Sequence, residues 1–282
     1  MTPDEAIQKQ IASWFRPLNT VGAAKAFPPA LTLSKDLKAR IPHELPGDAA
    51  VDAAIASHFM TAAVDIWLRG VHSFLISAAL TDSSPIWAAV VGYYSSHYTV
   101  RGLAHLLGHF QLFNDKALVR LRADAGGYVC GFVSKHGADH EHKFYWKMVK
   151  RSVLFQSDGL FTENPAGQVE SDVAHRNYAN YSDHLGTWPP FAPLSEQAIK
   201  DRVERISKIS LQAQPLPRTD RFPDLEYVQL AAYHRIVAFR DLVDNAIGQQ
   251  HKFWKVHRNP SFVQGYIDFQ LPVSDALAQL NS

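Results

Sequence analysis

Four polar side chains recur at every fourth position in an apolar stretch near the middle of the chain. They are His97, Arg101, His105 and His109. At helical spacing these side chains would lie along one face of a single helix. Because buried polar groups need partners, we interpret the row either as a structural hydrogen-bond network within a bundle or as part of a functional site.

The last two histidines of this row have the spacing of two metal ligands on one helix face. A zincin motif would need glutamate directly after the first of them, and Leu106 stands there. A second histidine cluster at 136–142 could complete a metal site, although a solvated loop is the simpler interpretation. This alternative hypothesis uses His105, His109, His140 and His142.

A polar segment at 172–184 gathers groups that can hold a phosphate and move a proton beside it. Arg176 and Asn180 would share one helical face, but an ordinary ion pair between Asp172 and Arg176 is the simpler alternative. Because the polar groups exceed what amphipathicity requires, we favour a functional role. The candidate catalytic residues are His175, Arg176, Asn177, Asn180, Tyr181 and His184.

Two segments near the C-terminus, 233–241 and 253–259, mix basic and aromatic residues. Such mixtures can contact a nucleic-acid backbone and stack on bases. More often they form a helix face whose Arg and Lys stems cover apolar surface.

The elements that position these residues are predicted to be mainly helical. Asp48 is a plausible N-cap for a helix of about 30 residues running from Ala49 to about Leu80. Ser84 and Pro85 begin a second long helix, which would run to about Gly108. So short a connection requires the two helices to pack antiparallel.

Shorter elements complete the predicted fold. A turn signal at 124–127 predicts a hairpin within 117–135. Further helices are predicted at about 140–154, 167–182, 195–212 and 225–255, with a last short helix in 260–282. We therefore expect a mainly α protein: a lead-in over 1–47, a helical bundle over 48–190 with a small β-hairpin-like insertion at about 117–135, and a helical C-terminal extension over 191–282.

Composition narrows the class of protein. The chain has 282 residues, 46 % of them hydrophobic, and a net charge of +1, so binding of nucleic acid through bulk charge is not expected. One cysteine, Cys130, excludes an intramolecular disulfide framework. The acidic start does not fit a signal peptide, and no uncharged apolar run reaches about 18 residues. These features predict a soluble cytoplasmic protein.

The segment Gly92-Tyr-Tyr-Ser-Ser-His-Tyr-Thr-Val-Arg-Gly-Leu-Ala-His-Leu-Leu-Gly108 resembles the second helix of the HEPN superfamily of helical-bundle proteins. That helix commonly carries paired tyrosines and packs against a long first helix. A later helix of the family carries Arg, a polar residue directly after it, and His four to six residues beyond the Arg. Arg176 and Asn177 match the first half, whereas His184 comes one residue late. The resemblance covers about 49–185.

This resemblance implies a metal-independent RNA endonuclease, often a toxin or an antiviral defence effector, that acts as a homodimer on RNA without a cofactor. Arg176 would be the cation and His184 or His175 the base, while Asn177 and Asn180 would orient the phosphate and Tyr181 would hydrogen-bond at the site. A protein partner such as an antitoxin would also fit. The first alternative is a non-catalytic HEPN-like module that binds RNA, a nucleotide or a protein. The second is the metal-dependent hydrolase.

Overall fold

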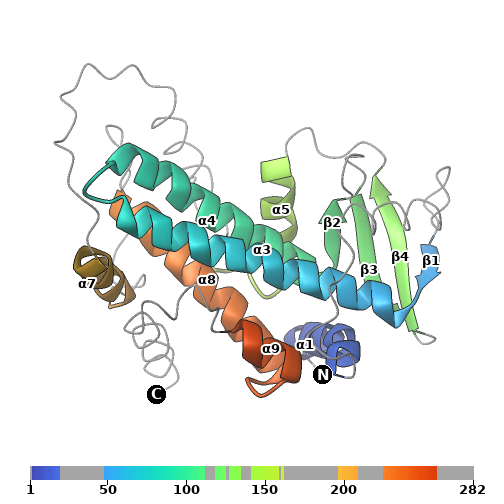
Figure 1. Cartoon of the computed structure of the whole chain (residues 1–282). Coiled ribbons are helices and arrows are strands. Elements are labelled where there is room, and N and C mark those ends of the chain that lie inside the picture. Colours follow the sequence, from blue (N-terminus) through green and yellow to red (C-terminus); the bar gives the residue numbers. More distant parts are fainter. Residues whose placement is uncertain are drawn as a thin grey trace. The chain divides into compact units, whose positions relative to one another are not determined.

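The computed structural model describes residues 2–19, 48–111, 118–124, 127–134, 141–158, 160–161, 196–208 and 225–258. These residues are mainly helical and include one small antiparallel sheet (Figure 1). They fall into two compact units. One contains the described parts of Met1–Trp67, Val100–Ser157 and Arg240–Arg258, and the other those of Leu68–Thr99 and Asp158–Phe239. The predicted boundaries at 47 and 190 lie outside the described residues.

The chain begins with helix α1, Pro3–Phe15, followed by the 3₁₀-helix η1, Arg16–Asn19. Thr2 and Glu5 form a capping box at the start of α1, in which each side chain accepts a hydrogen bond from the other residue's backbone N–H. One face of α1 packs into the protein, since Ile11, Trp14 and Phe15 are buried.

The first long helix starts later than predicted. Residues Asp48–Val51 form strand β1, and helix α3 runs over Ala53–Ala79. Asp52 caps this helix, its carboxylate accepting the N–H of Ile55 at 2.9 Å. The prediction of Asp48 as N-cap was wrong because the backbone of β1 pairs with another strand, a partner that local sequence does not reveal.

Helix α4, Pro85–Leu106, starts at the predicted proline. Two hydrogen bonds fix its pairing with α3 inside the second unit: Ser77 Oγ donates to Ala88 O, and Ser95 Oγ donates to Gly70 O, both at 2.7 Å. Partner positions fall along α3 as they rise along α4, so the helices are antiparallel, as predicted (Figure 1).

Glycine brings these helices close together. A Cβ on Gly70 would lie 2.5 Å from Thr99 Oγ1, and one on Gly92 would lie 2.8 Å from Val228 Cγ1. Neither position has room for a side chain without movement of its neighbours.

The sheet, which belongs to the first unit, has the order β1-β4-β3-β2. Strands β3, Leu118–Asp124, and β4, Gly127–Ser134, form the predicted hairpin. Two strands were not predicted: β1 pairs with β4, and β2, His109–Gln111, pairs with β3. The hairpin is therefore the centre of a four-stranded sheet.

Four more helices complete the described chain: α5 is Glu141–Lys150, α7 is Glu196–Ser207, α8 is Leu225–Ile247 and α9 is Lys252–His257. The single helix predicted over 225–255 was wrong. Gly248 has φ +75° and its N–H bonds to Asp244 O, which ends α8. The helix predicted over 167–182 and the tail at 260–282 lie outside the described residues.

Aromatic side chains build the core of the first unit. The rings of Phe59 and Phe110 are 3.7 Å apart and those of Trp67 and Trp254 are 5.3 Å apart. Among the described residues, the span Ile55–Ala79 is long and apolar enough to cross a membrane by length and composition, with a mean hydropathy of 1.2. A core helix of a soluble protein meets the same criterion.

Candidate functional site

The predicted ribonuclease site lies outside the described residues. This holds for every candidate catalytic residue, namely His175, Arg176, Asn177, Asn180, Tyr181 and His184. The structure does describe the polar row on α4 and the residues that gather at the C-terminal end of this helix.

The row of four does not lie on one helix. His97, Arg101 and His105 are on α4, but the helix ends at Leu106 and His109 is the first residue of β2. Gly108 causes the break: its φ is +84°, and a Cβ there would lie 2.4 Å from Leu121 O. The expectation that His105 and His109 present two ligands on one helix face was wrong for this reason.

In the second unit, the paired tyrosines of the HEPN resemblance belong to the packed interior. Tyr93 is fully buried and Tyr94 is half-buried, with their rings 5.4 Å apart at a steep angle. His97 is buried and stacks on Tyr93 with 6.3 Å between ring centroids. These residues position the helix rather than present a reactive group to solvent.

In the first unit, His105 is buried among aromatic rings. Its ring lies 4.4 Å from that of Phe110 and 5.7 Å from that of Tyr145, whose face also receives the Arg101 guanidinium at 5.3 Å. Burial, and then the charges of Arg101 and His109, hold the pKa of His105 well below its usual value. The imidazole is neutral at pH 7, and neither ring nitrogen has a hydrogen-bond partner within the described residues.

A neutral imidazole is also what a metal ion requires. The described residues nevertheless contain no group of three or more His, Cys, Asp or Glu side chains placed to hold one. His140 lies outside the described residues, and His142 is described only by its backbone in α5. The four-histidine metal site remains a prediction.

His109 lies beside a cation and a cavity. In the β2–β3 register it stands opposite Arg120. Burial and the positive charge of Arg120 lower the pKa of His109 to about 4. Both residues line a cavity of about 450 Å³ in the first unit, together with Gln10 from α1 and Arg151 and Ser152 from the turn after α5.

Sequence reasoning missed this cavity. Arg120 and Arg151 are ordinary basic residues in the sequence, and only the fold brings them to one cavity. One signal was available: in a strand where Val119 and Leu121 are buried, Arg120 must point to the opposite face.

The basic-aromatic segments near the C-terminus are anchored to the protein itself. In the second unit Arg235 is 1 % exposed; its Nη1 donates to Ser96 Oγ at 2.9 Å, and its Nε and Nη2 donate to Leu160 O. In the first unit Trp254 is fully buried and Arg240 is 3 % exposed. These three side chains are therefore neither exposed for contact with a nucleic acid nor spread over the surface of the protein.

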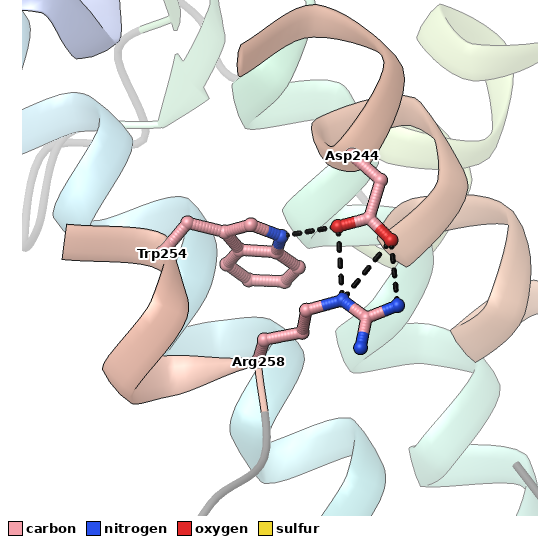
Figure 2. Close-up of polar contacts among 3 residues, drawn as sticks. All are labelled: Asp244, Trp254 and Arg258. Atoms are coloured by element: carbon pink, nitrogen blue, oxygen red, sulfur yellow. Dashed lines mark hydrogen bonds and ion pairs between the residues drawn. The ribbon is translucent and has the colours of Figure 1, made fainter. Parts of the chain in front are cut away.

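Asp244 ties α8 to α9 (Figure 2). Its carboxylate accepts hydrogen bonds from Trp254 Nε1 at 2.6 Å and from Arg258 Nη2 at 2.8 Å. Its neighbour Asp241 has a pKa raised to about 6, first by burial and then by the charge of Asp244, against the opposing effects of Arg240 and Arg258. This carboxylate pair was not predicted, and its sequence signal is the i,i+3 spacing of Asp241 and Asp244, which places two carboxylates on one face of α8.

The fold and site define a mainly α protein with a small antiparallel sheet and a cavity lined by two arginines and by His109, whose pKa is lowered. Comparison with protein-family models, with curated proteins and with solved structures gives no match.

Proposed function

We propose that this protein is a metal-independent RNA endonuclease of the HEPN type that acts as a toxin or antiviral defence effector in the cytoplasm. The observation that supports the proposal is the α3–α4 pair. Two long antiparallel helices joined by a short connection, in contact through Ser77 and Ala88 and through Ser95 and Gly70, are the arrangement that the resemblance predicts.

The proposed chemistry is general acid–base cleavage by the segment 175–184. His184 or His175 takes the proton of a ribose 2′-OH, whose oxygen then attacks the adjacent phosphorus. The bond from phosphorus to the 5′-oxygen breaks, and that oxygen takes a proton from water as it leaves, while the protonated histidine returns its proton to the solvent. Arg176 stabilises the charge that develops on the phosphate oxygens, and the amides of Asn177 and Asn180 hold the phosphate in place, with Tyr181 as a further hydrogen-bond donor.

The decisive variant is Arg176→Ala. Loss of one group that stabilises charge in the transition state costs about 10²–10³ in rate. Arg176→Lys should also be poor because an ammonium group cannot make the two parallel bonds of a guanidinium. The measurement is cleavage of a labelled single-stranded RNA in the presence of EDTA, with the melting temperature of each variant recorded beside it.

Arg122→Ala is the matched control, since it removes an exposed arginine of β3 outside the segment. It should leave the cleavage rate unchanged. If EDTA abolishes activity and zinc restores it, the metal-dependent hydrolase replaces this proposal. RNA that binds without being cut favours the non-catalytic module. The proposed homodimer is measured separately, by sedimentation.

A further inference from the structure

The cavity in the first unit has a positively charged lining. Arg120 comes from β3 and Arg151 from the turn after α5, and both side chains are exposed. Neither guanidinium forms an ion pair with any carboxylate among the described residues, and no acidic residue is among those found lining the cavity. Two guanidiniums that have no carboxylate partner among the described residues and line one concave surface are suited to an anion with more than one charged oxygen.

Neutral polar groups supplement the two charges. Gln10 offers an amide, and Ser152 offers a hydroxyl whose oxygen accepts the N–H of Leu154 at 3.4 Å, which leaves its own O–H to donate. These are donors of the kind that orient an oxyanion without adding charge.

The rest of the lining is apolar, and the volume exceeds what a bare anion fills. Ile7 from α1, Met148 from α5 and Leu107 from the turn between α4 and β2 contribute apolar surface. At about 450 Å³ the cavity falls within the range of about 300–1,000 Å³ typical of small-molecule sites. The occupant should therefore combine an anionic head with an organic body.

We propose that this cavity binds a small organic phosphate, with the dianionic phosphate between Arg120 and Arg151 and the organic body against Ile7, Leu107 and Met148. A carboxylate would balance only one of the two guanidiniums, which is why a phosphate is the better match. The site shares no residue with segment 175–184 and does not depend on the ribonuclease proposal.

His109 provides an internal reporter of occupancy. A bound dianion favours the protonated imidazole, whereas Arg120 and burial now disfavour it. Among the described residues, Arg120 and Arg151 are the charged side chains that line the cavity with His109, and His105 on α4 is the histidine whose pKa responds to the charge of His109. Occupancy should therefore raise the pKa of His109, which NMR titration of the imidazole protons measures with and without ligand.

The test uses isothermal titration calorimetry of the full chain with phenyl phosphate, with benzoate and inorganic phosphate as comparisons. Phenyl phosphate should bind more tightly than either. Arg120→Gln and Arg151→Gln should each weaken it at least about tenfold, since a hydrogen bond to a charged group contributes about 1.5–3 kcal/mol. Both arginines are exposed, so both variants should fold, which thermal melting checks.

Matched controls lie on β3 and on α5, the helix that precedes the turn with Arg151. Arg122→Gln on β3 and Lys147→Gln on α5 each remove an exposed cation that does not line the cavity. Both should leave the affinity for phenyl phosphate within about twofold of wild type.

Three results would overturn the proposal. The first is no binding of phenyl phosphate, or equal binding by wild type and Arg120→Gln. The second is benzoate binding as tightly as phenyl phosphate, which would indicate a carboxylate site. The third is displacement of phenyl phosphate by a single-stranded oligoribonucleotide at lower concentration, which would indicate a nucleic-acid surface. An Arg176→Ala protein that no longer cuts RNA should still bind phenyl phosphate, so the two proposals fail separately.

Discussion

Arg235 on α8 and the two arginines at the cavity show two ways in which a protein accommodates the same side chain. Arg235 is 1 % exposed and has a backbone carbonyl and a hydroxyl as acceptors. Arg120 and Arg151 are exposed at a concave surface and have no carboxylate partner among the described residues. The first arrangement stabilises a fold, and the second leaves hydrogen-bonding capacity for a ligand.

The difference teaches where to search for function in this chain. The conspicuous basic-aromatic segments contain buried side chains anchored by Leu160, Ser96 and Asp244. The positive charges without a carboxylate partner among the described residues belong instead to Arg120 on β3 and Arg151 in the turn after α5. A charged group that the fold already satisfies has little left to offer a substrate.

We expect the largest loss of stability when Arg235 is replaced. Arg235→Ala removes the donors to Leu160 O and Ser96 Oγ and leaves a void in a packed region, so we expect a loss of about 4 kcal/mol of unfolding free energy. Urea denaturation, monitored by circular dichroism, measures this loss. Arg120→Ala should change stability by less than about 0.5 kcal/mol. Equal losses in the two variants would break the comparison.

A second prediction concerns pH. The pKa of His109 is about 4 in the folded protein and 6.5 for an unperturbed histidine, so the unfolded chain binds more protons between these values. The contribution of His109 is complete above about pH 6.5 and is lost as the pH falls toward 4, by up to about 3 kcal/mol. In thermal melts from pH 4 to 7, His109→Gln should reduce the fall in melting temperature toward low pH. His72→Gln, at an exposed position of α3, should leave that fall unchanged.

The smallest predicted effects separate two neighbouring carboxylates. Asp244→Asn should lower stability at pH 7 by about 2 kcal/mol because Arg258 and Trp254 lose a charged acceptor. Asp241→Asn should raise it by about 1 kcal/mol, a figure discounted for partial exposure.

The stabilising effect expected of Asp241→Asn follows from the raised pKa of Asp241, about 6 against 3.8 for an unperturbed aspartate. The folded protein binds the extra proton, so the contribution is complete below about pH 4 and is lost as the pH rises through 6. A destabilised Asp241→Asn at pH 7 would show that the carboxylate makes a favourable interaction there.

Local chemistry in the sequence determined much of the helical framework. Pro85 was correctly placed at the first position of α4, because a fixed φ and a missing N–H suit that position whatever surrounds it. The hairpin of β3 and β4 also follows from its turn residues. Antiparallel packing of α3 and α4 follows from a connection too short for any other arrangement.

Tertiary structure decided where the strands at the sheet edges form and which polar groups meet. Strands β1 and β2 exist because distant backbones pair with them, and a strand of three or four residues has too weak a local signal. Gly248 ends α8 at a point that periodicity alone continues through. The burial of Arg235 and the meeting of Arg120 with Arg151 both depend on contacts between residues far apart in sequence, which spacing along one chain cannot encode.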